Sequence, residues 1–473
     1  MLVEMLVPDG VGVRNFLLGS FLERASTRAP VGVLHPIPEQ LLPDYRRGNG
    51  RVRFDPLIPY KDSAVAYALR NALGFAHMYW ADTGAMRYRR RLPANGSWGA
   101  RAKLNAARMV GWASASPSRM QMLDRWHRME VKRSPETAHY RRLFEQLRPR
   151  VLFCTHQRAA INLPAVLAAK SLGIPTATFI FSWDNITGKG RVAAPFDHYL
   201  VWSDHMRREL LRYYPDVTAD RVHLIGTPQF DPYADERLIW SKEEFFGRLH
   251  LDASRPLICY SGGDPFNFPE EQRYAALVLD LIREGRIHGR PQVLVRPTLV
   301  DSGTRFEDLL PTYPELRVVR PAWVHARPGD WSQVFPQPAD VQFLANLVRH
   351  ADVNINLQST MTLDFSIHDK PVVNIEFDMT SPPRFGVPLK EYFRKFDHYR
   401  PVFELGAARA AATPDELAAH VNSYLKDPSL DRDGRRRFVD LEVGVPIGHA
   451  SERIVDALER IAGLPVNENL RES

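Results

Sequence analysis

Strand-like and helix-like patterns alternate along most of the chain. RPRVLFCTH, INLPAVLAAKSLGIP, TATFIFSW, HYLVWS and DHMRRELLRYYP follow one another as strand, helix, strand, strand and helix. The strand segments are β-branched and aromatic without polar alternation, as expected of parallel strands covered on both faces. A second such series runs from PLICYSGG to PVVNIEF. The pattern predicts an α/β protein built from two doubly wound, Rossmann-like domains in tandem.

The alternation stops between residues 61 and 148. This segment is rich in Ala, Met, Arg and aromatic residues and predicts several helices inserted in the first domain. We therefore expect an N-terminal domain over 1–235 and a C-terminal domain over 236–412. The helical segment 413–473 is expected to pack back on the N-terminal domain.

Composition narrows the class of protein. With 473 residues the chain exceeds one ordinary core, and its 44% hydrophobic and 25% charged residues are typical of soluble globular proteins. Cys154 and Cys259 lie in apolar strands and are predicted to be buried thiols, which fits a reducing cytoplasm. The N-terminus has no basic segment followed by an apolar run, and no stretch reaches the roughly 18–20 apolar residues of a spanning helix. We expect a cytoplasmic protein.

The charge and the motifs limit the partners. A net charge of +7 favours an anionic partner, but the arginines are dispersed and no nucleic-acid recognition motif accompanies them, so we expect no nucleic acid. Complete GxGxxG, GxxxxGK[ST], HExxH and GxSxG motifs are missing from the sequence. We therefore expect neither a dinucleotide cofactor nor a metal ion.

Polar loops follow several predicted strands, where ligands of open α/β sheets bind. In the first domain FIFSWDNITGKGR turns from a buried strand to Asp184 and Lys189. In the second domain three loops share small, hydroxyl or cationic residues suited to phosphates: Ser261, Gly262 and Gly263; Arg296; and Gln358, Ser359 and Thr360. The simpler alternatives, an Asp/Asn/Gly turn at 184 and a helix cap at 359–360, remain open.

One segment resembles a known family. ADVNINLQSTMTLDFSIHDKPVVNIEFD is similar to the C-domain segment of GT-B glycosyltransferases and CDP-glycerol glycerophosphotransferases of bacterial surface-polymer synthesis. The match consists of Ser359, Thr360, Asp364 and the run Asp369-Lys370-Pro371-Val372. The similarity covers roughly residues 150–430. It implies the GT-B architecture, two Rossmann-like domains that face a cleft.

The same resemblance exposes two departures. FSWDNITGKG stands where glycerophosphotransferases carry a Trp-His-Gly…Lys loop; Trp183 and Lys189 match, but Asp184 replaces the histidine. Arg296-Pro297 stands where that subgroup shows His-Pro. Both departures favour a sugar nucleotide over CDP-glycerol as the donor.

The resemblance implies a glycosyltransferase of surface polysaccharide or glycoconjugate synthesis, with a nucleotide-sugar donor and a glycan or lipid-linked acceptor. We assign the base to Asp184, with His156 and Asp9 as further candidates because each follows a strand of the N-terminal domain. We assign the donor cradle to the following residues: Ser261, Gly262, Gly263, Arg296, Gln358, Ser359 and Thr360, with Asp364 toward the ribose and Lys189 toward the diphosphate.

Three other functions stay open: a CDP-glycerol-type glycerophosphotransferase, a nucleotide-sugar 2-epimerase and a nucleotide-sugar-binding protein without turnover. The insert combines Trp80, Trp112 and Trp126 with many arginines, as segments at membrane interfaces do. Peripheral contact with an anionic membrane, at its cytoplasmic face, and a solvated basic surface both fit this pattern.

Overall fold

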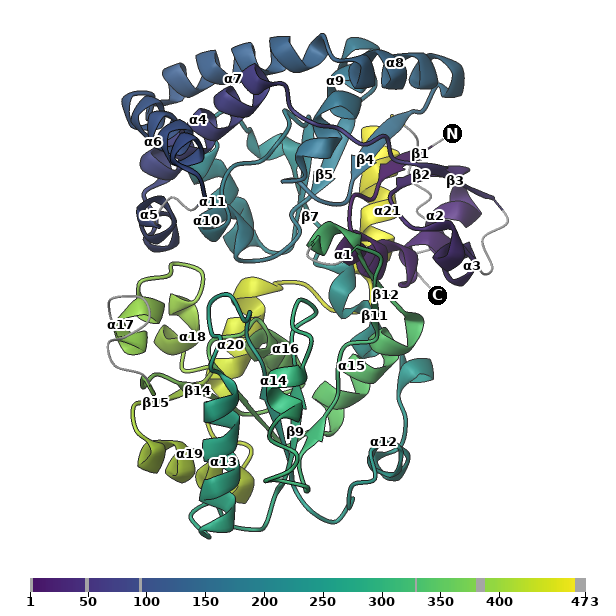
Figure 1. The fold of residues 1–473 in the computed structure, drawn as a ribbon. Coiled ribbons are helices and arrows are strands. Elements are labelled where there is room, and N and C mark those ends of the chain that lie inside the picture. Colours follow the sequence, from purple (N-terminus) through teal and green to yellow (C-terminus); the bar gives the residue numbers. More distant parts are fainter. Residues whose placement is uncertain (1–2, 47–50, 93–95, 328–329, 380–387, 464–473) are drawn as a thin grey trace. The chain divides into compact units, whose positions relative to one another are not determined.

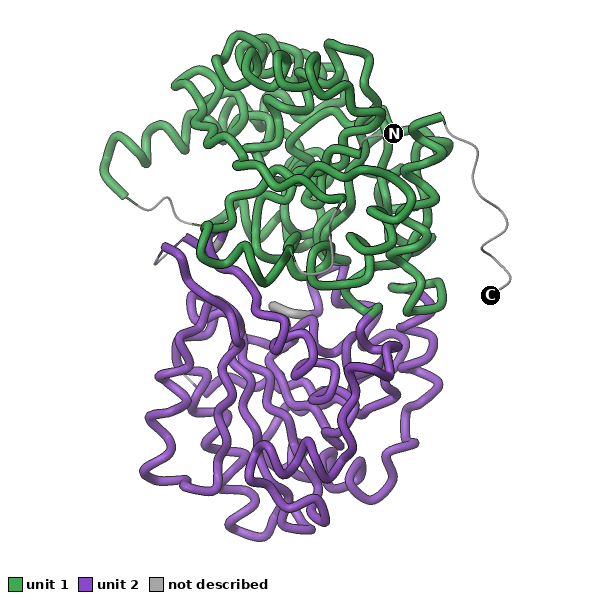
Figure 2. The backbone as a smooth tube through the Cα atoms, turned by 90° about the vertical axis from the view of Figure 1, so that its right-hand side faces the viewer, with its two compact units in different colours: residues 1–231, 443–473 green, residues 232–442 purple. Residues whose placement is uncertain are grey.

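The computed structural model describes residues 3–46, 51–92, 96–327, 330–379 and 388–463. The chain forms two compact units, Met1–Asp231 with Val443–Ser473 and Pro232–Glu442 (Figure 2). Each unit contains one large parallel sheet, so the predicted pair of tandem Rossmann-like domains is confirmed.

The first unit is built on a seven-stranded sheet in which every neighbouring pair is parallel. In spatial order its strands are β3 (Val52–Pro56), β2 (Val31–His35), β1 (Val3–Leu6), β4 (Val151–Cys154), β5 (Thr176–Phe179), β6 (His198–Val201) and β7 (Val222–Leu224). The central strands β1, β4 and β5 are buried throughout, as expected of strands covered on both faces, and β4 (VLFC) is apolar at every position. The order reverses between β1 and β4, as in Rossmann folds.

Helices that alternate with the strands in the sequence pack around this sheet (Figure 1). They include α2 (Phe21–Arg28), α3 (Leu42–Arg46), α9 (Leu163–Ser171), α11 (Asp204–Tyr213) and α21 (Ala450–Ile461). A separate π-helical turn, Val13–Leu17, precedes α2. Phe16 of that turn is fully buried and packs edge-on against Phe153 of β4.

The predicted helical insert is confirmed. It consists of α4 (Ala64–Ala81), α5 (Gly84–Arg91), α6 (Trp98–Ala113), α7 (Pro117–Lys132) and α8 (Pro135–Leu147). Serine or threonine caps begin α4, α5, α6 and α8, where each hydroxyl accepts a backbone N–H of the first turn. Both α6 and α7 pack against α4, and Leu73 of α4 forms a small core with Met120 and Leu123 of α7.

The second unit holds a six-stranded parallel sheet. In spatial order its strands are β10 (Arg317–Val318), β9 (Gln292–Arg296), β8 (Leu257–Ser261), β13 (Val353–Asn356), β14 (Val372–Ile375) and β15 (Arg409–Ala411). The order again reverses near the middle, between β8 and β13. A separate antiparallel pair is formed by β11 (Trp323–His325) and β12 (Val334–Pro336).

The helices of the second unit follow the predicted alternation. They include α12 (Lys242–Arg248), α13 (Gln272–Arg283), α14 (Thr304–Glu307), α15 (Pro338–His350), α16 (Met361–Ile367), α17 (Leu389–Arg394), α18 (Arg400–Glu404), α19 (Pro414–Lys426) and α20 (Arg432–Glu442).

The C-terminal helices divide between the units, whereas the sequence placed all of 413–473 with the first domain. Helix α19 packs on β13, β14 and β15, and α20 packs on α16, so both belong to the second unit. Helix α21 packs on α2 and β4 of the first unit. An ion pair at 2.5 Å between Arg28 of α2 and Asp456 of α21 joins these two helices. The units therefore change at 231 and 442, against the expected boundaries at 235 and 412.

Gly111 determines how closely α6 approaches α4. A Cβ atom there would lie 2.5 Å from Phe75 Cβ and 2.9 Å from the backbone nitrogen of Ala76. Gly99, in the first turn of the same helix, has no atom within 4 Å of such a Cβ. Alanine substitutions at the two glycines therefore distinguish a steric limit on helix packing from the effect of helix propensity.

We expect Gly111→Ala to lower the free energy of unfolding by about 1–3 kcal/mol, because backbone atoms of α4 must move. The matched variant Gly99→Ala should be neutral or stabilising by up to about 1 kcal/mol. Thermal and urea denaturation of both variants measure the difference. Equal shifts in the same direction would contradict the packing constraint.

Candidate functional site

Asp9 lies at the strand-order reversal of the first sheet, directly after β1. It caps α1 (Gly10–Gly12), with Oδ1 accepting hydrogen bonds from Val11 N at 3.1 Å and Gly12 N at 3.0 Å. A Cβ atom at Gly12 would lie 2.6 Å from Thr155 Oγ1. Glycine at this position therefore lets α1 sit against the end of β4, which brings Asp9 to the loop after that strand.

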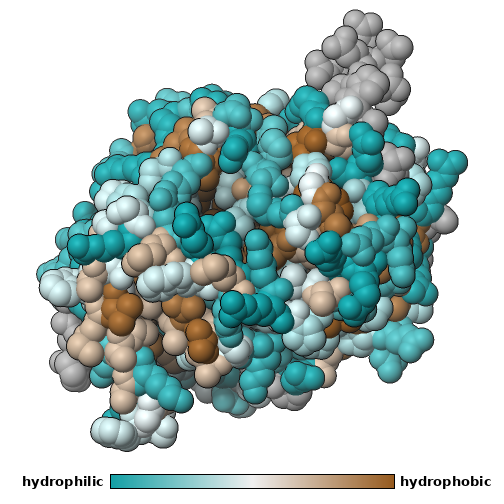
Figure 3. Space-filling view, turned by 90° about the horizontal axis from the view of Figure 1, so that it is seen from above, coloured by the Kyte–Doolittle hydropathy of each residue, from teal (hydrophilic) through white to brown (hydrophobic). Residues whose placement is uncertain are grey.

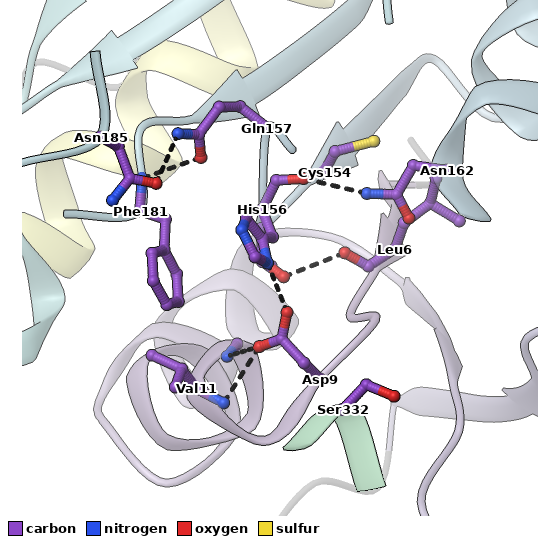
Figure 4. A network of polar contacts seen from close by, with 12 residues as sticks. Leu6, Asp9, Val11, Cys154, His156, Gln157, Asn162, Phe181, Asn185 and Ser332 are labelled. Carbon is purple, nitrogen blue, oxygen red and sulfur yellow. Dashed lines mark hydrogen bonds and ion pairs between the residues drawn. The ribbon is translucent and has the colours of Figure 1, made fainter. Parts of the chain in front are cut away.

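His156 follows β4 and faces Asp9 (Figure 4). Its Nδ1 lies 2.5 Å from Asp9 Oδ2, and both side chains are buried. The imidazole stacks on the Phe181 ring at a centroid distance of 4.3 Å and an interplanar angle of 11°, and Asn162 Nδ2 donates to the His156 carbonyl at 3.0 Å. The structure thus brings together two of the three predicted proton-transfer residues and fixes the ring orientation.

The pKa of Asp9 is lowered. Burial alone raises it, but the charge of His156 and the hydrogen bonds from His156, Gly12 and Val11 outweigh burial. Asp9 is therefore held as a carboxylate, which favours the His156 tautomer with its proton on Nδ1.

The Asp184 loop forms a second cluster after β5. Asp184 Oδ1 accepts from Asn185 Nδ2 at 2.8 Å, and Asp184 Oδ2 lies 3.1 Å from Lys189 Nζ. Gln157, next to His156, donates to Asn185 Oδ1 at 2.9 Å and accepts from Phe181 N at 3.1 Å. Gln157 thereby ties the His156 segment to the Asp184 loop, as Figure 4 shows.

The second unit also gathers predicted residues at its strand-order reversal. Ser261 at the end of β8 is the register partner of Arg296 on β9 and of Asn356 on β13. Gln358 follows with φ of 55°, a left-handed conformation uncommon for a non-glycine residue. Ser359 N donates to Asn356 Oδ1 at 2.7 Å, and its Oγ accepts from Met361 N at 3.3 Å. Ser359 therefore closes the turn into α16.

The two predicted cradle glycines already use their N–H groups within the protein. Gly262 N donates to the Arg296 carbonyl at 2.9 Å, and Gly263 N donates to Glu271 Oε2 at 2.7 Å. Burial raises the pKa of Glu271 to about 7, against the opposing charge of Arg305, which lies 3.1 Å away. An anion bound here would have to share or displace these donors.

Arg296 and Asp364 also have partners inside the second unit. Arg296 Nη2 lies 2.5 Å from Asp340 Oδ1, both side chains are buried, and the guanidinium lies over the Phe343 ring at 5.1 Å. Asp364 accepts a hydrogen bond from Tyr233 Oη. Their roles in donor binding remain predictions. The contact that the structure shows for Arg296 is its buried ion pair with Asp340.

A buried asparagine network that was not predicted from the sequence lies beneath the second reversal. Asn354 Nδ2 donates to Ser261 Oγ at 2.7 Å, Asn356 Nδ2 to Asn354 Oδ1 at 2.6 Å, and Asn374 Nδ2 to Asn356 Oδ1 at 2.8 Å. All three side chains are fully buried. Asparagines at alternate positions of an otherwise apolar strand, VNIN, were the available signal, because buried amides need partners. Gln157 and Asn185 were also missed, although both adjoin predicted residues.

No group of three or more His, Cys, Asp or Glu side chains among the described residues is placed to hold a metal ion.

Comparison with known proteins identifies the fold. No protein-family model matches the chain, and no curated protein matches its sequence. A Staphylococcus aureus MnaA–UDP structure aligns with a TM-score of 0.51 at 10% identity, over 98% of this chain and 97% of that one. A Neisseria meningitidis UDP-GlcNAc 2-epimerase bound to UDP-GlcNAc aligns with 0.52 at 10% identity, over 97% and 100%. A Rickettsia africae glycosyltransferase aligns with 0.50 at 8% identity, over 100% and 99%.

The expected fold of two Rossmann-like domains, of the GT-B kind, is thus confirmed along nearly the whole chain. At 8–10% identity the alignments identify a fold and leave the reaction open.

We expect Arg296→Ala to lower the free energy of unfolding by about 3–5 kcal/mol, because it leaves the buried Asp340 carboxylate without its cation. Asp340 also accepts hydrogen bonds from Ala322 N and Trp323 Nε1, each at 2.7 Å, so the carboxylate cannot simply turn to solvent. The control Arg141→Ala removes an exposed pair with Glu145 and should cost less than about 1 kcal/mol. Thermal denaturation compares the two; equal small losses would show that the buried pair contributes little.

Proposed function

We propose that this protein is a glycosyltransferase that moves a sugar from a nucleotide-diphosphate donor to a hydroxyl group of a glycan or lipid-linked acceptor. The observation that carries the proposal is the Asp9–His156 pair at the strand-order reversal of the first sheet. Ligands of open parallel sheets bind beyond the carboxyl ends of the strands at such a reversal. A buried histidine oriented by a carboxylate is an arrangement suited to general-base catalysis.

In the proposed reaction His156 takes the proton of the acceptor hydroxyl. In the tautomer with the proton on Nδ1, which faces Asp9 Oδ2, the lone pair that accepts the proton is on Nε2. The acceptor oxygen forms a bond to the anomeric carbon as the bond from that carbon to the diphosphate breaks. The nucleotide diphosphate leaves with the bonding electrons. Asp9 stabilises the imidazolium that forms.

Asp184 remains the alternative base. Lys189 Nζ lies 3.1 Å from its Oδ2, and Asn185 Nδ2 donates to its Oδ1, so both carboxylate oxygens already have partners in the protein. In the proposal Asp184 instead positions Lys189, whose ammonium group can neutralise charge on the leaving diphosphate.

The donor is assigned to the second unit. Residues 261–263 leave β8 and residues 358–360 leave β13, so two loops with small and hydroxyl side chains border the same reversal. Backbone N–H groups and hydroxyls at such a point suit a diphosphate. Arg296 and Asp364 complete the predicted set, although Arg296 is also paired with the buried Asp340.

A nucleotide-sugar 2-epimerase is the second candidate function. It is favoured by the structural likeness to the epimerases named above, which extends over nearly the full length of both chains. The two candidates differ in their need for an acceptor: an epimerase changes the sugar of the donor alone.

The function is tested in two steps. Thermal-shift measurements with UDP-, GDP-, CDP-, dTDP- and CMP-sugars identify the donor through the stabilisation on binding. The selected donor is then incubated alone and with glycan and polyprenyl-phosphate acceptors, and products are followed by NMR and mass spectrometry. Acceptor-dependent nucleotide release supports the transferase. A changed sugar without acceptor supports the epimerase, and binding without any product contradicts both.

We expect His156→Ala to lower kcat by about 10²–10⁴-fold while the thermal shift with the donor is preserved, because only proton transfer is lost. Asp9→Asn should also lower kcat, since the ring loses its orienting carboxylate. His205→Ala, on α11 of the same unit, is the control and should retain activity. Steady-state kinetics of these variants and Asp184→Asn decide the base: full activity in His156→Ala with none in Asp184→Asn would assign it to Asp184.

A further inference from the structure

The excess positive charge of the protein is confined to the helical insert. Residues 61–148 contain 17 Lys and Arg against 6 Asp and Glu, a net charge of +11, whereas the whole chain has +7. The remainder of the protein is therefore net negative. A local charge of this size attracts anionic surfaces.

Exposed apolar side chains are concentrated in the same segment. Of the 14 large hydrophobic residues that are exposed in the described part of the chain, 10 lie between Val65 and Met129. Figure 3 views the molecule from the side of the helices drawn at the top of Figure 1 and shows hydrophobic residues gathered among hydrophilic ones. Combined apolar and basic exposure distinguishes this surface from an ordinary solvated face.

Helix α6 has the pattern of an interfacial helix. Its inner face, with Ala107 and Gly111, packs on α4. At helical spacing on the outer face lie the residues of what we call the α6 stripe: Trp98, Ala102, Asn105, Met109 and Trp112. Trp98 is 85% exposed, Met109 67% and Trp112 69%. The core of the insert therefore does not use these large side chains.

Arg101 borders the α6 stripe on one flank, and Lys103 lies farther round the helix. At 100° per residue, Arg101 is adjacent to the stripe, whereas Lys103 lines the side of α6 that faces α4. Both are exposed, and Arg101 Nε donates a hydrogen bond to the Gly96 carbonyl at 3.1 Å. Helix α7 repeats the pattern with Met122, Trp126 and Met129, each at least 44% exposed.

A groove lies between α4 and α6, on the side of α6 that carries Lys103. It has a volume of about 1190 Å³, and its walls include Tyr67, Leu104 and Val110, with Lys61 and Lys103 beside them. Apolar walls next to ammonium groups match the division between acyl chains and anionic headgroups.

We propose that the helical insert docks on an anionic lipid surface, with the α6 stripe entering the boundary between headgroups and acyl chains. Tryptophan favours this depth, because its ring is apolar and its N–H can still find water or phosphate. Arg101, beside the stripe, reaches the headgroup phosphates, and Lys103 in the neighbouring groove adds to the positive charge near the surface. No helix in the described part of the chain is long and apolar enough to cross a bilayer. The inference goes beyond the proposed reaction and does not rest on it.

The test is co-sedimentation of the full-length protein with vesicles. We expect it to pellet with vesicles of phosphatidylglycerol and phosphatidylcholine at low ionic strength, more weakly at high ionic strength, and least with phosphatidylcholine alone. The triple variant Trp98→Ala, Met109→Ala, Trp112→Ala should bind the anionic vesicles at least about tenfold more weakly than the wild type. The matched control Phe266→Ala, Val300→Ala, Leu310→Ala removes exposed apolar side chains of the second unit and should bind like the wild type.

A second variant separates charge from apolar insertion. The double variant Arg101→Glu, Lys103→Glu leaves the α6 stripe intact. Its affinity for anionic vesicles should fall by about fivefold or more for each charge reversed. Wild-type protein that stays in the supernatant with anionic vesicles at low salt would overturn the proposal, as would an unchanged triple variant. Circular dichroism verifies folding of every variant. Light scattering that shows a dimer dissociated by the triple variant would assign the stripe to self-association and also overturn the proposal.

Discussion

The candidate site depends on one constraint of parallel sheets. Where the strand order reverses, the connections leaving two neighbouring strands run to opposite faces, so backbone does not fill the space beyond their carboxyl ends. In the first unit this point lies between β1 and β4, and the loops after them supply Asp9 and His156. In the second unit it lies between β8 and β13, where the loops of Ser261 and Ser359 begin. Side-chain chemistry is thus placed by topology before any specific contact forms.

A second constraint, the cost of burying unpaired polar groups, decides which predicted residues are available to a ligand. The carboxylate of Asp9 contacts two backbone N–H groups and the imidazole of His156. Its oxygens are therefore already paired, and the histidine is the group available for proton transfer. Gly263 donates to Glu271, and Arg296 pairs with Asp340. A residue can therefore lie at the expected edge and still serve mainly to hold a loop that another group needs.

The fold was predictable from the sequence because burial on both faces of a parallel strand requires an unbroken apolar run, and VLFC and LICYS satisfy it. Strand ends were also predictable, since polar loops follow such runs directly. Pairings were not. Asp9 and His156 are separated by 147 positions, and nothing local in either segment encodes that β1 and β4 are neighbours. For the same reason Asp340 could not be recognised as the partner of Arg296. The split of α19 and α20 from α21 depends on which sheet each apolar face covers, which helical periodicity alone does not specify.

The distribution of charge changes what the overall positive charge means. Residues 232–442 carry 26 Lys and Arg against 31 Asp and Glu, a net charge of −5, although this unit is the proposed donor domain. A diphosphate bound there would gain nothing from the net field of the unit. It would have to be held by local dipoles: N–H groups, hydroxyls and the amides that orient them. This requirement gives the buried Asn354–Asn356–Asn374 network a physical purpose, because a rigid turn loses little entropy when its dipoles meet an anion. Most cations of the insert, by contrast, lie on long exposed side chains, which suit a fluid, variable surface of phosphates better than one fixed ligand.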